Sequence, residues 1–402
     1  MDNALKKVGI FLPITLGMLT AFGPFMTDFY LPSMPELMDY FKTSPSAVSG
    51  SLTAGMVGLA VGQILIGPLS DKFGRKRLLV LSMLIFAITS VLCILAPTIH
   101  VFNALRVVQG MAGAGGVVLA KSVATDMFTG KALANFLALL GAINGIAPVC
   151  APLIGGTLAS FTSWQGVFCV LLAIGLVLMM CTIRMKESLP IDKRSTKGLG
   201  NVYGKLFKVF TNRLYTLSTI SMMFTYFTFF AYISASPFIF QNIYGLTPFQ
   251  YSMCFATNAL CIGVGAGLAT RFHHDNTALK WGTINLMIAT LLVGVCQTLH
   301  LPLWFLMPCY IYMMVAFGII QPVSTAIAMD TERNNAGAAS AIFGAASFVA
   351  GAIVSPVVTI GDIMISTTLV MVGGAALALA LTLPLCATIK KIKMQQQAAQ
   401  QA

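Results

Sequence analysis

Two ionisable residues stand alone inside long apolar stretches of the sequence, and one is an acid and the other a base. Asp28 and Arg106 are the only ionisable side chains that fall well within these stretches. A charge in hydrocarbon costs at least ~3 kcal/mol on insertion scales, so such residues usually face a protein interior or a watery cavity. Because approach or retreat of a guanidinium can switch the proton occupancy of a carboxyl group, the two residues suggest proton handling. A permanent ion pair that only fastens two helices is the structural alternative.

The remaining sequence explains why charges in these stretches are unusual. Its 402 residues are 57% hydrophobic and 9% charged, and the mean hydropathy is +0.86. A soluble fold would have too few polar residues to cover its surface. Apolar runs of roughly 18 to 25 residues recur along the chain, the length that a helix needs to cross a bilayer core. We expect an all-α membrane protein with twelve transmembrane helices, at about 8–31, 46–69, 78–97, 101–124, 132–159, 164–184, 214–240, 248–270, 281–300, 303–328, 336–360 and 366–389.

These spans place the acid and the base at similar depths in the membrane. Asp28 comes about three residues before the outer end of the first span, and Arg106 about five residues after the outer start of the fourth. At 1.5 Å of rise per residue, the two depths agree to within roughly 3 Å. The spacing therefore allows Asp28 and Arg106 to pair.

The basic residues mark one side of the membrane. With the N-terminus inside, every lysine and arginine except Lys42 and Arg106 falls in an inner segment. The positive-inside rule then predicts that both termini are cytoplasmic in a multi-pass protein of the bacterial inner membrane. The first span follows Lys6 and Lys7, and we expect it to be retained because it is too long for a signal peptide. The net charge of +12 consequently indicates topology and not nucleic-acid binding.

A basic linker divides the spans into two sets of six. We expect an N-terminal bundle at 1–184, a cytoplasmic linker at 185–213 and a C-terminal bundle at 214–402. At an offset of 203 residues, Pro45 aligns with Pro248, Gly62 with Gly265 and Arg77 with Lys280. This weak parallel repeat predicts two pseudo-symmetric six-helix bundles, a known plan of transporters.

The loop after the second span carries the most specific motif, GPLSDKFGRKRLL. Its candidate residues are Gly67, Asp71, Gly74, Arg75 and Arg77. We expect Gly67 to permit close helix approach and Gly74 to form a tight turn. Asp71 could sit at a helix N-terminus or pair with Arg75. The loop would then act as a conformational latch, whereas an ordinary basic loop is the simpler alternative.

This loop is similar to the signature of the major facilitator superfamily, and three further segments narrow the resemblance. TDFYLPSMPEL at 27–37, LRVVQGMAGAGG at 105–116 and APLIGGTLASFTSWQGVF at 151–168 resemble the drug:proton antiporter group with 12 transmembrane helices, in its bicyclomycin-resistance (Bcr/CflA) multidrug efflux branch. The resemblance implies the major facilitator fold and a role in antibiotic resistance. It also implies that Asp28 and Arg106 serve proton coupling and that Gln109 and Gly110 belong to the substrate site. His274 and Thr277 occupy the equivalent of the Asp71 and Gly74 positions in the second half.

Candidate residues of a substrate cavity come from several spans. On the fourth span, polar and small residues follow a three-to-four spacing and share one face. Aromatic residues in the seventh span suit amphipathic or planar molecules, although packing or lipid contact is an equally ordinary role for them. The candidates are Tyr30, Asn103, Gln109, Gly110, Asn144, Tyr226, Phe227 and Phe230. Trp164 is expected to be an interfacial anchor.

The fifth span reads GAINGIAPVCAPLIGG and resembles the antiporter motif of the family. Its prolines can kink the helix and its glycines allow close approach to a neighbour. Alanine stands at positions 147 and 151, where the family pattern has glycine, so an ordinary proline-kinked helix remains an alternative. The expected antiporter-helix residues are Pro148, Pro152, Gly155 and Gly156.

We expect a secondary active transporter that exports drugs or small amphipathic metabolites by proton-coupled antiport. A proton-coupled carrier for a metabolite such as a nucleoside or sugar is the alternative. The sequence lacks the G-x-x-x-x-G-K-[ST] phosphate loop of an ATP-driven pump, and one acid and one base form no charged ring of a channel. An enzyme is not expected, because the outer side offers only Glu36, Asp39 and Asp362 as acids.

The expected partners are a small-molecule substrate, protons and the lipid bilayer, with no nucleic acid. We expect no cofactor and no metal: the nine cysteines lie singly in apolar spans and suit packing. His273 and His274 fall in a short inner loop and could bind a metal, but a solvated loop is the ordinary interpretation. Two six-helix halves in one chain predict a functional monomer.

Overall fold

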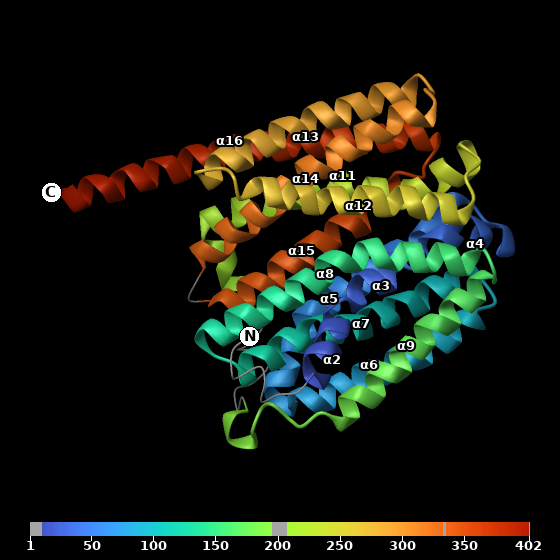
Figure 1. Ribbon diagram of the computed structural model, residues 1–402, viewed down its shortest axis with the longest axis horizontal. Helices are drawn as coiled ribbons and strands as arrows, with labels where there is room; N and C mark the ends of the chain where they lie inside the picture. Colours follow the sequence, from blue (N-terminus) through green and yellow to red (C-terminus); the bar gives the residue numbers. More distant parts are fainter. Residues whose placement is uncertain (1–9, 195–206, 333–334, 402) are drawn as a thin grey trace. The chain divides into compact units, whose positions relative to one another are not determined.

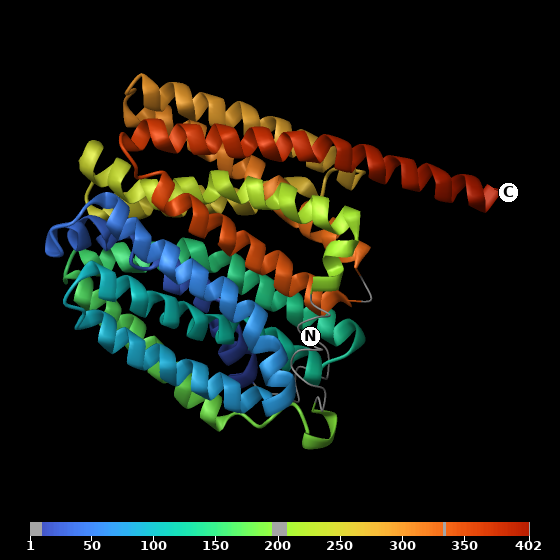
Figure 2. The same ribbon diagram turned by 180° about the vertical axis from the view of Figure 1, so that it is seen from behind.

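The computed structural model describes residues 10–194, 207–332 and 335–401, and all regular secondary structure in these ranges is helical. Figures 1 and 2 show the helices from opposite sides. Eleven helices among the described residues are long and apolar enough to cross a membrane. The predicted all-α membrane fold is thus confirmed. Lys6, Lys7 and Arg333, which entered the topology prediction, lie outside the described ranges.

The first expected span is not one continuous helix. It is formed by α2 (Phe11–Thr20) and α3 (Phe22–Asp28), with Ala21 between them. Pro24 accounts for the interruption, because proline lacks a backbone N–H and its ring crowds the carbonyl four residues earlier. A 3₁₀ turn, η1 (Leu31–Ser33), and α4 (Met34–Tyr40) follow.

The remaining spans occur in the expected order. They are α5 (Pro45–Phe73), α6 (Arg75–Ile94), α7 (Ile99–Met127), α8 (Gly130–Ala159), α9 (Trp164–Arg184), α11 (Arg213–Phe238), α12 (Pro248–Ala269), α13 (Asp275–Thr298), α14 (Leu303–Thr331), α15 (Ala336–Val357) and α16 (Ile363–Gln401). Short turns occupy η2 (Ile191–Lys193), η3 (Phe207–Thr211) and η4 (Ile239–Ile243). The last helix runs beyond the expected end near residue 389, because the lysine-, glutamine- and alanine-rich tail favours helix.

Residue contacts divide the chain into two compact units. The first holds Met1–Gly204 and Phe240–Ala256, and the second holds Lys205–Ile239 and Thr257–Ala402. The changeover at residues 204 and 205 falls inside the linker expected at 185–213. Two further changeovers, at residues 239 and 240 in η4 and at residues 256 and 257 in α12, have no counterpart in the sequence-based division.

Glycines set a close helix contact of the first unit, between α5 and α7. A Cβ atom on Gly58 would lie 2.8 Å from the backbone nitrogen of Met111, and one on Gly62 would lie 2.7 Å from the Met111 carbonyl oxygen. A Cβ on Gly110 would lie 3.1 Å from the Cα of Gly58. Since the two backbones touch, larger side chains at these positions have no room. This contact fixes the helix that carries Arg106.

The second unit repeats the contact with different residues. A Cβ atom on Gly265 of α12 would lie 2.9 Å from the Cα of Gly318 of α14. Gly62 and Gly265 are a pair in the 203-residue repeat, and each brings its helix against the helix two positions later in its unit. The same packing device therefore serves both halves of the repeat.

Candidate functional site

Arg106 of α7 is fully buried and has only neutral partners among the described residues. Its Nη1 donates to Oε1 of Gln109 at 2.5 Å, and its Nη2 donates to the carbonyl oxygen of Met26 at 3.0 Å. The guanidinium carbon lies 4.5 Å from the ring centre of Tyr30 and 5.7 Å from that of Phe168. Ring faces attract cations, so dipoles and aromatic rings hold this charge in place of a carboxylate.

The acceptor on α3 is available because of where that helix ends. The last carbonyls of a helix have no intrahelical partner, and α3 ends at Asp28, two residues after Met26. Arg106 takes this free carbonyl. Gln109 is held in turn, since its amide donates to the hydroxyl of Ser90 on α6 at 2.8 Å. Three helices thus position one guanidinium.

The structure does not bring Asp28 and Arg106 into contact. Asp28 is 5% exposed, its Oδ1 accepts from the Thr27 hydroxyl at 2.8 Å, and it forms no ion pair within the described part of the chain. The direct pair that the spacing allows is therefore not formed in this conformation. Asp28 and Arg106 nevertheless lie at similar depths, because Arg106 contacts Met26 and Tyr30, which lie on either side of Asp28 in the sequence.

The other cavity candidates of the first unit have different surroundings. Tyr30 is buried, and its hydroxyl shares a 2.9 Å hydrogen bond with Ser51. The amide of Asn103 donates to the carbonyl of Ala47 at 3.1 Å. Gly110 packs against the α5 backbone, while Asn144 is exposed on α8. Tyr30 and Gln109 therefore gather around Arg106, whereas Asn103, Gly110 and Asn144 do not.

Aromatic side chains cluster in the second unit. Tyr226 stacks on Phe230 with ring centres 5.7 Å apart, and it meets Phe317 of α14 edge-on at 5.3 Å. Phe348 of α15 approaches Phe230 at 6.5 Å. Phe227 does not join them: it packs against Gly374 of α16. The sequence missed Phe317 and Phe348, because a single phenylalanine in an apolar span carries no signal of its own.

The antiporter-helix candidates lie on α8, which includes Pro148 and Pro152 without a break. Gly155 touches the backbone of Phe29, and a Cβ atom on Gly156 would lie 2.7 Å from the carbonyl oxygen of Pro248. The two glycines therefore permit close contact with the segment after α3 and with the start of α12, as the motif suggested.

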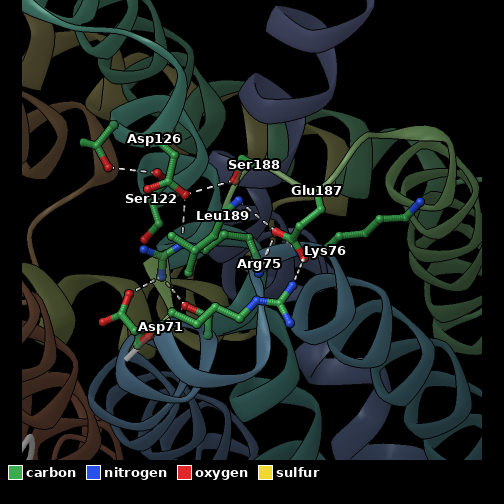
Figure 3. A network of polar contacts seen from close by, with 12 residues as sticks. Asp71, Arg75, Lys76, Ser122, Asp126, Glu187, Ser188 and Leu189 are labelled. Carbon is green, nitrogen blue, oxygen red and sulfur yellow. Dashed lines mark hydrogen bonds and ion pairs between the residues drawn. The ribbon is translucent and has the colours of Figure 1, made fainter. Parts of the chain in front are cut away.

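The inner loop forms a network of charges, shown in Figure 3. Arg75 is buried, and it pairs with Asp71 at 2.5 Å and with Asp126 of α7 at 3.0 Å. Its Nη1 also donates to the Ser70 hydroxyl at 2.5 Å. The expected pairing of Asp71 with Arg75 is present, and Asp126 adds a second carboxylate that the sequence reading did not single out.

Glu187 lies at the N-terminus of α6. The sequence had made Asp71 one candidate for such a position. Its carboxylate accepts from the backbone nitrogens of Arg75 at 3.0 Å and Lys76 at 3.3 Å, the first residues of α6. A carboxylate there is favoured by the helix dipole. Ser188 donates to Asp126 at 2.9 Å. The chain after α9 is thereby tied to both ends of the network (Figure 3).

The glycines and the last arginine of the motif differ in their roles. Gly74 has a φ of +99°, and a Cβ atom there would lie 2.6 Å from Oε2 of Glu187, so glycine is required. A Cβ on Gly67 would make only an ordinary 3.7 Å contact with Val118, so the expected close approach at Gly67 is absent. Arg77 is exposed and makes no ion pair within the described residues, so the network forms without it.

The interpretation of Trp164 needs correction. Trp164 is fully buried among the rings of Tyr40, Phe102 and Phe168, so it is no interfacial anchor. Its backbone nitrogen donates to Oε2 of Glu36 at 2.9 Å, and partial burial raises the pKa of Glu36 while this hydrogen bond opposes the rise.

Two of the cysteines meet across neighbouring helices. The sulfur atoms of Cys296 on α13 and Cys309 on α14 lie 3.7 Å apart. Both side chains also face the carbonyl oxygen of Phe305. Thiols in an apolar setting pack as small hydrophobic groups with weak donors, so a packing role still accounts for them.

Comparison with known proteins decides the family. A family model described as Major Facilitator Superfamily matches residues 16–356. The chain belongs to the major facilitator superfamily. This superfamily is a family of transporters and not of enzymes.

Individual members of the superfamily resemble the chain over most of its length. It is 35% identical over 368 residues to the uncharacterised MFS-type transporter YdgK of Bacillus subtilis, covering 90% of this chain and 92% of that one. It is 30% identical over 366 residues to a bicyclomycin resistance protein homolog of Haemophilus influenzae, with 89% and 90% coverage. The bicyclomycin resistance protein homolog confirms the resemblance to the drug efflux branch. The xylose transporter XylE from E. coli shares the fold, with a TM-score of 0.72 at 13% identity over 93% of this chain and 97% of that one.

Proposed function

We propose that this transporter exports drugs or small amphipathic molecules by antiport with protons. Relatives named for resistance to bicyclomycin and to several drugs support export. The motifs of α7 and α8 resemble those of drug:proton antiporters, which supports coupling to protons. The proposal places the protein in the bacterial inner membrane with both termini in the cytoplasm, working as a monomer.

The observation that carries the proposal is the pair of buried ionisable groups without a mutual ion pair. Arg106 is held by a carbonyl, an amide and aromatic rings, and Asp28 accepts from one hydroxyl. A buried charge that lacks an opposite charge is expensive, so such groups are kept for a purpose. In the proposed cycle, Asp28 binds and releases the coupled proton, and a change in its distance from Arg106 shifts its proton occupancy.

Transport by the reconstituted protein tests the coupling role of Asp28. An Asp28→Asn variant is expected to lose export of a neutral substrate driven by a pH gradient, while substrate counterflow continues without the gradient. The matched control is Asp39→Asn on α4, which removes an exposed carboxylate outside the buried site. Undiminished gradient-driven export by the folded Asp28→Asn variant would remove Asp28 from proton coupling.

A proton-coupled uptake carrier for a sugar or nucleoside is the second candidate. The fold is shared with a xylose transporter, and the same scaffold can run in either direction. The direction of proton-driven accumulation in everted and right-side-out vesicles separates the two candidates. Accumulation of drugs in everted vesicles supports export, and accumulation of a sugar or nucleoside in right-side-out vesicles supports uptake.

The network at Asp71, Arg75 and Asp126 is proposed to act as a conformational latch on the cytoplasmic side. Arg75 shares its charge between two carboxylates from different helices. Arg75 is buried and would lose partners if these helices moved apart, so opening and closing of the network can favour one state of a transport cycle over another.

A further inference from the structure

A cavity beside the inner loop is lined by three cationic side chains. The ion pairs around the latch network neutralise these side chains only in part or not at all. It measures about 520 Å³ and lies where α6 begins and α9 ends. Its lining residues are Lys76, Arg77, Val80, Leu81, Ile183, Glu187 and Arg194. Figures 1 and 2 show α6 and α9 running side by side, so the cavity opens at one end of a helix pair that spans the membrane.

The cationic wall of the cavity has an unbalanced charge. Lys76 and Arg77 form no ion pair within the described residues, and Figure 3 shows the Lys76 side chain extending away from the network. Arg194 lies 3.5 Å from Glu187, and its Nε atom is buried without a hydrogen-bond partner. Glu187 already accepts from the α6 backbone. Three cations thus face one carboxylate, which leaves an excess of positive charge for an anionic ligand.

The opposite wall is apolar and continues along the two helices into the membrane. On α6, Leu81, Leu84 and Ile88 follow helical spacing and are 41–51% exposed. On α9, Val177, Met180 and Ile183 are 49–55% exposed. Both helices are apolar enough to span a bilayer. An apolar track that leads away from a cationic end matches a molecule with an anionic head and hydrocarbon chains.

We propose that this cavity binds the phosphate headgroup of an anionic phospholipid such as phosphatidylglycerol. Lys76, Arg77 and Arg194 would bind the phosphate, and the acyl chains would lie along α6 and α9. Basic pockets between membrane helices are suited to anionic headgroups, and each cation near such a surface contributes about 1 kcal/mol. Because Lys76 and Arg77 follow Arg75 directly, the lipid would sit against the latch network without belonging to it.

Native mass spectrometry of the full-length protein in detergent tests the proposal. The first phosphatidylglycerol molecule is expected to bind more tightly than phosphatidylcholine with the same chains. The Lys76→Gln/Arg77→Gln variant should weaken phosphatidylglycerol binding by roughly fivefold for each cation removed and leave phosphatidylcholine unchanged. Equal binding of the two lipids by the unmodified protein would overturn the proposal.

A matched variant separates this cavity from general surface charge. Arg184→Gln/Lys186→Gln removes two exposed cations close in sequence that do not line the cavity, and it should keep the preference for phosphatidylglycerol. An equal loss in both double variants would contradict a defined site. If the double variant does not fold, the single variant Arg77→Gln, which changes an exposed side chain, provides the same test.

A thermal-unfolding measurement distinguishes a lipid from a free anion. Phosphatidylglycerol is expected to raise the melting temperature of the unmodified protein, whereas inorganic phosphate at the same concentration should not. If inorganic phosphate stabilises the protein as much as the lipid does, the acyl chains contribute nothing and the assignment to a lipid is wrong.

Discussion

Arg106 carries a full positive charge in a setting that offers it no negative one among the described residues. Arg106 donates hydrogen bonds to Gln109 and Met26, and its guanidinium lies over the ring of Tyr30. These neutral groups together stabilise its charge. Because guanidinium is planar with several donors, it can make these contacts together, whereas an ammonium cannot. The side chain is therefore held in one geometry although its charge is not neutralised.

The first prediction concerns the geometry of Arg106. Arg106→Lys keeps the charge but cannot retain both hydrogen bonds and the ring contact, so it should reduce export strongly. Arg106→Ala should reduce it at least as much and leave Gln109 without its partner, at a cost of about 1–3 kcal/mol. Export rates and melting temperatures of both variants provide the measurement. Normal export by a folded Arg106→Ala variant would contradict the role given to this residue.

A second residue-scale prediction concerns Glu36, whose partial burial raises its pKa. The folded protein then favours the protonated acid more than the unfolded chain does, so stability should fall as pH rises from about 4.3, the ordinary glutamate pKa, through the raised value. Glu36→Gln can still accept from Trp164 but does not ionise, so its melting temperature should depend less on pH in that window. Identical pH profiles of the two proteins would exclude this contribution.

Sequence reasoning found the buried charges but not their contacts. Asp28 and Arg106 stand out because charges are rare in apolar runs, and helix rise alone places them at similar depths. The acceptor of the Arg106 hydrogen bond is determined by where α3 ends, and local backbone geometry sets that end. A carbonyl oxygen has no signature in sequence, so the contact with Met26 could not be predicted.

At the scale of helices, close contact between α5 and α7 depends on three glycines that meet face to face. Gly58, Gly62 and Gly110 leave no space for a Cβ atom. Small residues drive helix association in membranes because apolar burial gains little there. The geometry around Arg106 thus depends on a backbone contact between the helix that carries it and its neighbour.

Substitution of Gly58 tests this dependence. Gly58→Ala would place a Cβ atom 2.8 Å from the Met111 nitrogen, and such overpacking costs typically about 1–3 kcal/mol. The variant should therefore unfold at lower temperature. Gly141→Ala on α8 is the control, because open space surrounds Gly141 and alanine favours helix. A Gly58→Ala protein as stable as the control would contradict the close contact.

The helices were largely predictable, and the exceptions have local causes. Apolar length located the eleven membrane-length helices to within a few residues at most ends, because hydropathy and span length leave few choices. The interruption of the first span at Ala21 could have been anticipated from Pro24. Glu187 could not be assigned to the α6 N-terminus, since the sequence does not show how the chain after α9 returns to it.

At the scale of the whole molecule, the distribution of lysine and arginine makes a prediction about sidedness. A cysteine introduced at position 195, which lies outside the described residues, should react with a membrane-impermeant thiol reagent only from the cytoplasm. The basic linker must remain inside for the positive-inside rule to hold. Labelling in intact cells and in everted vesicles is the measurement, with the unmodified protein as the background for its nine cysteines. Reaction from the outside would reverse the topology.

The fold of both units follows from the repeat, but the exact division does not. Gly62 and Gly265, which the 203-residue offset aligns, each bring their helix into close contact with the helix two positions later, although their contact residues differ. The assignment of Phe240–Ala256 to the first unit depends on which neighbours that segment touches, and composition carries no information about this.

Because the acceptor that Arg106 uses on α3 is a main-chain oxygen, no side-chain replacement on α3 deletes that atom. Random mutagenesis of residues 22–28 should consequently leave the bond standing unless a change, such as a new proline, redirects the backbone. The same contact can be abolished from the other side by a single codon change at position 106. Side-chain substitutions in α3 therefore preserve the interaction, whereas a single substitution at position 106 in α7 removes it.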